Sequence, residues 1–284
     1  MSQNDLSALK LHATLVEKIN FACHQSAFAV LRDLRIENTN EEQDLSDLTV
    51  TLDASPAFVK QKTWRVDRLA AGGLLALKDR DLELDGGFLL GLTESMRGTV
   101  TLTVRQSGDV LAEQNMPVEL LACNEWGGAS YMPELLAAFC TPNDPAVDKL
   151  LGQASQILRK AGKPDQINGY DANSREQVWL MASAIYTAIV KLQLGYALPP
   201  ASFEKNGQKV RLPHHVESAK VATCLDTTLL FAAALEQAQL NPLVILTEGH
   251  ALVGLWLEKE DLASVVIDEA ETLRQRIPLQ ELIL

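Results

Sequence analysis

Three residues in the last third of the chain are of the types that thiol enzymes use for acyl transfer. Cys224 stands where a loop becomes a helix, His250 begins an expected strand, and Asp268 follows the apolar run Val265–Ile267. The positive end of a helix favours a thiolate, which is the nucleophile in this chemistry. A histidine can accept the thiol proton, and a carboxylate can fix the tautomer of that histidine. We therefore predict a catalytic site made of Cys224, His250 and Asp268.

The elements expected around these residues could bring them together. A helix is predicted from Cys224 to about Ala238, and Asn241-Pro242 ends the helical segment. Three strands are predicted to follow, at residues 243–247, 251–258 and 264–270. If the last two were adjacent and antiparallel, His250 and Asp268 would lie side by side. A helix packed on that sheet would then carry Cys224 to the imidazole of His250.

Some neighbouring residues offer alternatives. Glu269 and Asp261 are rivals for the carboxylate role, but Asp268 directly follows the apolar run and so ends a strand. His214 and His215 could suggest a metal, yet adjacent residues of a strand point to opposite faces and cannot share one ion. We expect neither a metal nor a cofactor.

The loop before the cysteine and the tryptophans are the other candidates for a cleft or a core. Tyr196, Phe203 and the Pro199-Pro200 segment are candidates for one wall of a substrate groove. Trp126, Trp179 and Trp256 are most simply core residues, although Trp256 would share a strand face with His250. Cys23, Cys123 and Cys140 are interpreted as small buried side chains.

The order of motifs resembles the transglutaminase-like (papain-like) cysteine fold. A Cys-x-Asp sequence opens a helix, His-Ala begins a strand, and an aspartate follows on the next strand. The resemblance implies that Cys224 attacks an amide or thioester carbonyl, with His250 and Asp268 completing the triad. It also implies a structural role for Asp226. The spacing from Cys224 to His250 is short for that family, and the backbone N–H of Cys224 is the one oxyanion donor that we identify.

A wider stretch resembles the N-terminal region of very large bacterial superfamily-one helicase proteins. The similar segments are VELLACNEWGG, PELLAAFCTPNDPAVDKLL, YALPPASFEKNGQKVRLP and ATCLDTTLLFAAALEQAQLNPLVI. Some of those proteins end in a very-short-patch-repair-like endonuclease, and they are associated with defence against phage and foreign DNA. The resemblance implies an accessory module whose partners include helicase domains of the same polypeptide. The chain has no GxxxxGK[ST] motif, so it does not hydrolyse ATP by that mechanism.

The periodicity of the sequence predicts an α+β fold with two domains, residues 1–123 and 124–284. Alternating runs in the first part predict a β-sandwich, with Ser107-Gly108-Asp109 as a hairpin turn, while residues 26–38 and 88–96 fit either helix or strand. After Asn124–Gly128 the pattern becomes helical. Helices are expected at residues 132–140, from Pro145 to about Lys160 with Asp144 as N-cap, and at about 174–194 with Ser174 as cap.

Composition and charge limit the classes of function. The 284 residues carry a formal net charge of -12, which repels nucleic-acid phosphates and anionic lipids. We expect no direct binding to nucleic acid and no membrane association. The first residues lack the pattern of a signal peptide, and no run of 18 apolar residues occurs, so we predict a cytoplasmic location.

Two functional hypotheses follow from these observations. In the first, the Cys-His-Asp site acts on a protein amide or peptide bond, by hydrolysis or by transfer to an amine. In the second, the domain keeps the triad fold without catalysis and serves as a protein-interaction module that positions the helicase motor.

Overall fold

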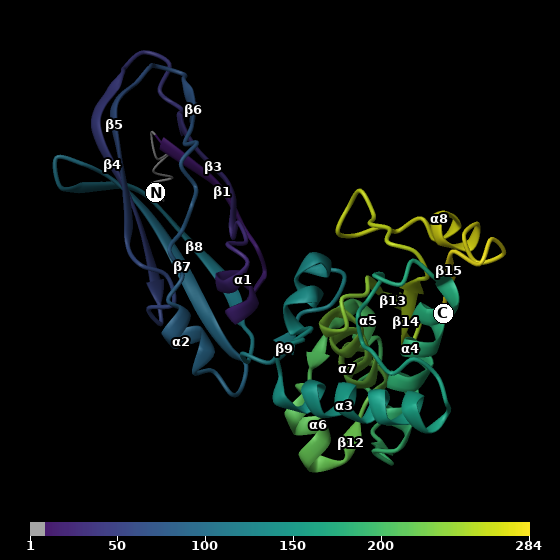
Figure 1. Ribbon diagram of the computed structural model, residues 1–284. Coiled ribbons are helices and arrows are strands. Elements are labelled where there is room, and N and C mark those ends of the chain that lie inside the picture. The colour runs from purple at the N-terminus through teal and green to yellow at the C-terminus, as the bar shows by residue number, and fades with distance from the viewer. Residues whose placement is uncertain (1–8) are drawn as a thin grey trace. The chain divides into compact units, whose positions relative to one another are not determined.

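The computed structural model describes residues 9–284, which divide between Cys123 and Asn124 into two compact units (Figure 1). The prediction that the N-terminal segment lacks a signal peptide falls partly on residues 1–8, which lie outside the described residues. The chain is a mixed α+β protein with several separate sheets. No helix among residues 9–284 is long and apolar enough to cross a membrane.

Two sheets make up most of the first unit. The larger sheet has the order β2-β8-β7-β4-β5, and the smaller has the order β1-β3-β6. The elements are β1 (Leu9–Leu15), β2 (Lys18–Ile19), α1 (Phe21–Gln25), β3 (Leu31–Asn38), β4 (Leu45–Ser55), β5 (Lys62–Leu69), β6 (Leu74–Ala76), α2 (Gly86–Leu90), β7 (Met96–Gln106) and β8 (Asp109–Leu120). The hairpin predicted at Ser107-Gly108 is confirmed, since β7 and β8 pair antiparallel across it.

Alternation explains why these segments are strands. In β4 the buried residues Leu48, Val50 and Leu52 share one face, as the period of two requires. The ambiguous segment 26–38 forms strand β3 from Leu31, and segment 88–96 is divided between α2 and the start of β7.

The second unit combines helices with short strands. Its elements are β9 (Glu125–Trp126), η1 (Pro133–Phe139, a 3₁₀ helix), α3 (Pro145–Lys160), α4 (Arg175–Val190), β10 (Gly195–Tyr196), α5 (Phe203–Asn206), β11 (Gln208–Lys209), α6 (Pro213–Ala219), β12 (Val221–Ala222), α7 (Cys224–Gln237), β13 (Pro242–Thr247), β14 (His250–Trp256), α8 (Ala270–Arg274) and β15 (Leu282–Ile283). Helices α3, α4 and α7 pack around a common core, and the β13–β14 hairpin packs against α7.

The predicted helix starts in this unit are confirmed. Asp144 caps α3, with its side chain accepting from the Ala146 amide, and Ser174 caps α4 by accepting from the Gln177 amide. Helix α7 begins at Cys224 and is rich in alanine, which has the highest intrinsic helix propensity.

The predicted position of the third strand in the C-terminal sheet is wrong. Residues 264–268 are irregular and exposed, with Val265 82% exposed. The third strand is instead β15, which pairs with Leu255 and Trp256 of β14. The physical reason is burial, because Leu282 of β15 is almost completely removed from solvent whereas residues 265–267 are not.

Two smaller points concern the histidine pair and the tryptophans. His214 and His215 are an exposed pair in the first turn of helix α6, and their rings are in contact at 4.1 Å between centroids. Trp126 and Trp256 are buried as predicted, but Trp179 is 50% exposed on α4.

Candidate functional site

The start of α7 is held by a capping box. Thr223 is the N-cap, and its hydroxyl accepts from the Asp226 amide at 3.2 Å. The Asp226 carboxylate in turn accepts from the Thr223 amide at 2.8 Å. This reciprocal pair satisfies two amides that a helix start would otherwise leave unpaired. Asp226, for which a structural role is predicted, is fully buried in the first turn of α7, two residues after Cys224.

Two residues from earlier in the chain, Gln208 of β11 and Arg211 of the loop before α6, tie this helix start to the rest of the unit. Arg211 binds both oxygens of the Asp226 carboxylate, through its backbone amide at 2.8 Å and its guanidinium Nη1 at 3.0 Å. Gln208 donates from Nε2 to the Thr223 hydroxyl at 2.9 Å, and its Oε1 has no hydrogen-bond partner among the described residues. The charge of the buried carboxylate is thus neutralised by Arg211.

Cys224 occupies the first position of the helix and is 4% exposed. Amides at this end of a helix have no intrahelical partner, and the capping box uses only the amides of Thr223 and Asp226. Within residues 9–284 the amides of Cys224 and Leu225 make no hydrogen bond in the structure, and both residues are buried. Amides in this position are the donors that an oxyanion on a carbonyl carbon bonded to the sulfur would use. The helix start is arranged to stabilise negative charge on Cys224 or on a group bonded to it.

Tyr196 lies close in the fold to the start of α7. Its strand β10 pairs parallel with β12, and Tyr196 stands opposite Ala222, two residues before Cys224. Desolvation and the neighbouring Cys224 thiol raise the pKa of the Tyr196 phenol above its ordinary value. The sequence placed Tyr196 in a possible groove wall, but its position beside this helix start comes from the short pairing of β10 with β12, which no periodicity indicates.

His250 lies at the first position of β14, as predicted, and is exposed. From α7 the chain turns back through residues 238–241 and β13 runs along the helix to Thr247, which pairs with His250. Both α7 and β13 are about 20 Å long. If β13 runs antiparallel along α7, against which it packs, the β13–β14 turn with His250 comes toward the start of the helix.

Asp268 lies in the exposed irregular segment before α8. No hydrogen bond or ion pair joins Cys224, His250 and Asp268 within residues 9–284. Of the two rivals, Asp261 accepts from Asn241 Nδ2 at 3.0 Å, and Glu269 precedes α8 without a side-chain cap bond.

A second histidine–carboxylate pair was not found by the sequence. The Nδ1 atom of His214 lies 2.6 Å from Oδ2 of Asp144. The residues are 70 positions apart, and the carboxylate also caps α3, so sequence spacing carries no sign of the contact. The pair joins the starts of α3 and α6.

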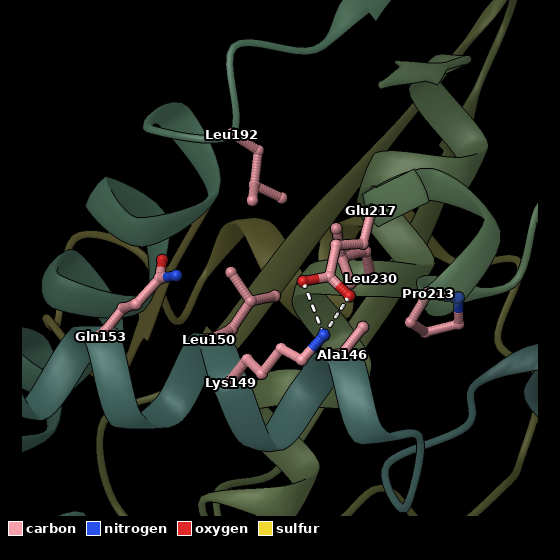
Figure 2. Close-up of a pocket in the computed structure, with 8 residues that line it drawn as sticks. All are labelled: Ala146, Lys149, Leu150, Gln153, Leu192, Pro213, Glu217 and Leu230. Atoms are coloured by element: carbon pink, nitrogen blue, oxygen red, sulfur yellow. Dashed lines mark hydrogen bonds and ion pairs between the residues drawn. The ribbon is translucent and has the colours of Figure 1, made fainter. Parts of the chain in front are cut away.

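Within the described chain no group of three or more His, Cys, Asp or Glu side chains could hold a metal ion. Figure 2 shows a hollow of about 10 Å³ beside the Lys149–Glu217 ion pair, with Leu150 and Leu230 among its lining residues. This hollow is about the size of one water molecule and does not include Cys224 or His250.

A larger hollow, of about 590 Å³, lies between the start of α4 and β15 and is lined by Trp179, Ile277 and Leu284 among others. Its lining residues come from the start of α4, from Leu257 just after β14 and from residues 277–284, and they do not include Cys224 or His250. The candidate site is therefore defined by the start of α7 and the residues around it.

Comparison with known proteins gives no assignment. A scan against protein-family models and a search of curated proteins found no significant match to the chain. A function for the chain is therefore inferred from the chemistry and placement of these side chains.

Proposed function

We propose that residues 124–284 form a transglutaminase-like thiol domain that acts on an amide or peptide bond of a protein. Cys224 is the nucleophile, His250 the base and Asp268 the carboxylate that orients the histidine. The observation that supports the proposal is a cysteine at the first position of a capped helix, α7, with His250 at the first position of β14, a strand that packs against this helix.

The proposed reaction has two steps. His250 removes the Cys224 proton, and the sulfur attacks the substrate carbonyl carbon to form a tetrahedral oxyanion, which the amides of Cys224 and Leu225 stabilise. The C–N bond then breaks, the leaving amine takes the proton from His250, and a thioester remains on Cys224. Water or a second amine attacks the thioester, gives its proton to His250, and releases the thiol.

Asp268 requires a rearrangement of its segment in this proposal. Residues His250 to Gly254 of β14 pair with β13 on one edge, while β15 covers the other edge only at Leu255 and Trp256. Residues 264–268 carry exposed β-branched side chains of the kind that favours strands. Antiparallel addition of this segment to the open edge would bring Asp268 beside His250.

The test uses p-nitrophenyl acetate as a general acyl donor. We expect a burst of nitrophenolate and acetylation of Cys224 detected by peptide mass spectrometry. Cys224→Ala should abolish the burst, and His250→Ala should slow it by about 10²–10⁴-fold, the usual contribution of general-base catalysis. A burst of wild-type size in Cys224→Ala would refute the proposal.

Matched controls separate the site from general reactivity. His12→Ala removes an exposed histidine of the first unit, which is bonded to Glu37, and should leave the burst unchanged. Iodoacetamide at neutral pH should label Cys224 faster than Cys23, Cys123 and Cys140. Equal labelling of the four cysteines would count against an activated thiol.

The second candidate function is a non-catalytic module, and the burial of Cys224 favours it. A thiol that is 4% exposed is also what a structural cysteine would show. In this alternative the domain positions the helicase motor of a larger polypeptide. Full activity of a Cys224→Ala variant, in a protein that contains those helicase domains, would support this alternative.

The remaining parts of the proposal concern the context of the domain. We propose that the first unit is a β-sandwich and that the chain is an accessory region of a bacterial helicase-type protein with a role in phage defence. The four free cysteines fit a reducing compartment such as the cytoplasm. Co-purification of helicase domains with this chain would test the association.

A further inference from the structure

We propose that Gln208 is a specificity-determining residue of the Cys224 site, whose side-chain oxygen accepts a hydrogen bond from the N–H of the substrate amide. The inference rests on the proposed function, because it assigns a role in the same acyl chemistry. It goes beyond the triad, since it gives the site a reason to select an amide over an ester.

Two contacts fix the position of Gln208 at the start of α7. Its strand β11 pairs antiparallel with β9, where Gln208 stands opposite Trp126. Its side-chain Nε2 donates at 2.9 Å to the hydroxyl of Thr223, the N-cap of α7 and the residue before Cys224. The amide group of Gln208 therefore lies at the end of the helix that carries the thiol.

The oxygen of the same amide group has no partner. Gln208 is 4% exposed, and within residues 9–284 its Oε1 makes no hydrogen bond. Oε1 and Nε2 are bonded to the same carbon, so the oxygen also lies close to the helix start. A buried acceptor without a donor costs free energy, and most such atoms in proteins are satisfied. This oxygen is therefore suited to accept from a bound ligand.

The start of α7 offers unpaired groups of the opposite kind. The amides of Cys224 and Leu225 are donors in the first turn, and neither makes a hydrogen bond within the described residues. An ester or thioester has only oxygen acceptors for these donors. An amide has a carbonyl oxygen for them and also an N–H for Oε1 of Gln208, so it satisfies both kinds of group.

Other acceptors at this helix end are occupied. The Asp226 carboxylate accepts from Thr223 and twice from Arg211, and the Thr223 hydroxyl accepts from Gln208 and Asp226. Glu204 of α5 also has an unpartnered buried oxygen, Oε2, but no hydrogen bond among the described residues joins its side chain to α7. Gln208 is thus the acceptor that the structure ties to the thiol-bearing helix.

The role of Gln208 is binding without proton transfer. The N–H that it accepts from stays on the leaving nitrogen throughout, and the additional proton of the leaving amine still comes from His250. A site that pairs a substrate N–H discriminates against the analogue that lacks it, because the buried acceptor is then left unpaired.

The experiment compares two chromogenic substrates that carry the same acetyl group. p-Nitroacetanilide has an N–H where p-nitrophenyl acetate has an oxygen. We measure kcat/KM for both with wild type and with Gln208→Met, which keeps the length of the side chain and removes the amide. The ratio of anilide to ester kcat/KM should fall by about 3–10-fold, as the loss of one hydrogen bond predicts. Gln153→Met, at an exposed glutamine of α3, should leave the ratio unchanged.

The ratio separates specificity from structure, since a disturbed helix start slows both substrates alike. An unchanged ratio in Gln208→Met would overturn the inference, and so would a wild-type protein that releases nitrophenolate from the ester but no nitroaniline from the anilide. Either result leaves the proposed thiol chemistry standing. Release from neither substrate by wild type would overturn the proposed function and this inference together.

A second measurement needs no variant. Acetanilide should inhibit the wild-type ester reaction at about 3–10-fold lower concentration than N-methylacetanilide, which keeps the carbonyl and lacks the N–H. Equal inhibition by the two compounds would also overturn the inference.

Discussion

Arg211 binds the carboxylate of Asp226 twice, with its backbone amide on Oδ1 and its guanidinium on Oδ2. The carboxylate is fully buried and also accepts from the Thr223 amide. One side chain thus fixes both the loop before α6 and the start of the helix that carries Cys224. The position of Cys224 in the proposed site therefore depends on the contact between Arg211 and Asp226.

Replacing Asp226 by alanine should strongly destabilise the second unit. The change leaves the Thr223 and Arg211 amides without an acceptor and the Arg211 charge without a partner, which costs about 3–5 kcal/mol for a broken buried pair. Urea unfolding followed by tryptophan fluorescence in a Trp64→Phe background reports mainly on residues 124–284. As a control, Asp165→Asn breaks an exposed pair with Arg159 and should leave the midpoint unchanged. Equal effects of the two changes would contradict the structure.

Thr223 should be replaceable by serine but not by valine. The hydroxyl caps α7 and accepts from Gln208, so valine loses both hydrogen bonds at nearly constant volume. We expect a loss of about 1–2 kcal/mol for Thr223→Val and a small change for Thr223→Ser. The same urea titration measures both variants, and a valine variant as stable as the serine variant would refute the role of the hydroxyl.

Gly207 should tolerate no side chain. Its φ is +91°, and a Cβ there would lie 1.9 Å from the carbonyl oxygen of Trp126, where two distant segments cross. Gly207→Ala should therefore prevent normal folding of the second unit, seen as loss of near-ultraviolet circular dichroism. Gly152→Ala lies in α3 with open space around it and should instead stabilise by about 0.5–1 kcal/mol.

The Asp144 carboxyl should make the free energy of unfolding depend on pH. Burial alone would raise the pKa of this carboxyl, but hydrogen bonds from the His214 ring and from the Ala146 and His214 amides outweigh it and lower the pKa. A lowered folded-state pKa means that the stabilisation is present above the ordinary aspartate pKa and is lost as pH falls through the folded value. Wild type should exceed Asp144→Asn in melting temperature at pH 7.

The difference between wild type and Asp144→Asn should shrink as the pH falls below about 4. Thermal melts at a series of pH values measure it. A gap that stays constant down to the acid limit would show that the carboxylate charge is unimportant.

The Glu236 carboxylate should lower the reactivity of the Cys140 thiol. Desolvation, the Glu236 charge and their contact at 3.4 Å raise the pKa of the Cys140 thiol far above its ordinary value. Glu236→Gln removes the charge and should speed alkylation of Cys140 at pH 8–9, with labelling of Cys123 as the internal reference. Unchanged labelling would contradict the charge effect.

The elements that the sequence predicts best are those set by local chemistry. Asp144 with Pro145, and Ser174, mark helix starts through capping and proline geometry, and both starts are correct. The strand of residues 264–270 was not predictable in the same way. Its apolar run satisfies the strand pattern, but the competition with Leu282 for the edge of β14 is decided by tertiary burial.

The candidate site shows the same division. Cys224 and His250 lie at the element starts that the sequence predicts, because capping and turn residues determine those positions. Tyr196 is held opposite Ala222 by a pairing between segments 26 residues apart, which leaves no local pattern in the sequence.

The pairing that holds Tyr196 is only two residues long on each side, whereas Cys224 belongs to a helix with a buried face. Short pairings of this kind open locally far more often than packed helices unfold. The amides of Gly195 and Ala197 should therefore exchange with deuterium much faster than those in the middle of α7. Brief separation of β10 from β12 would free the short segment that leads into Cys224 while the helix stays intact, so the surroundings of the thiol would change by a small opening of the chain.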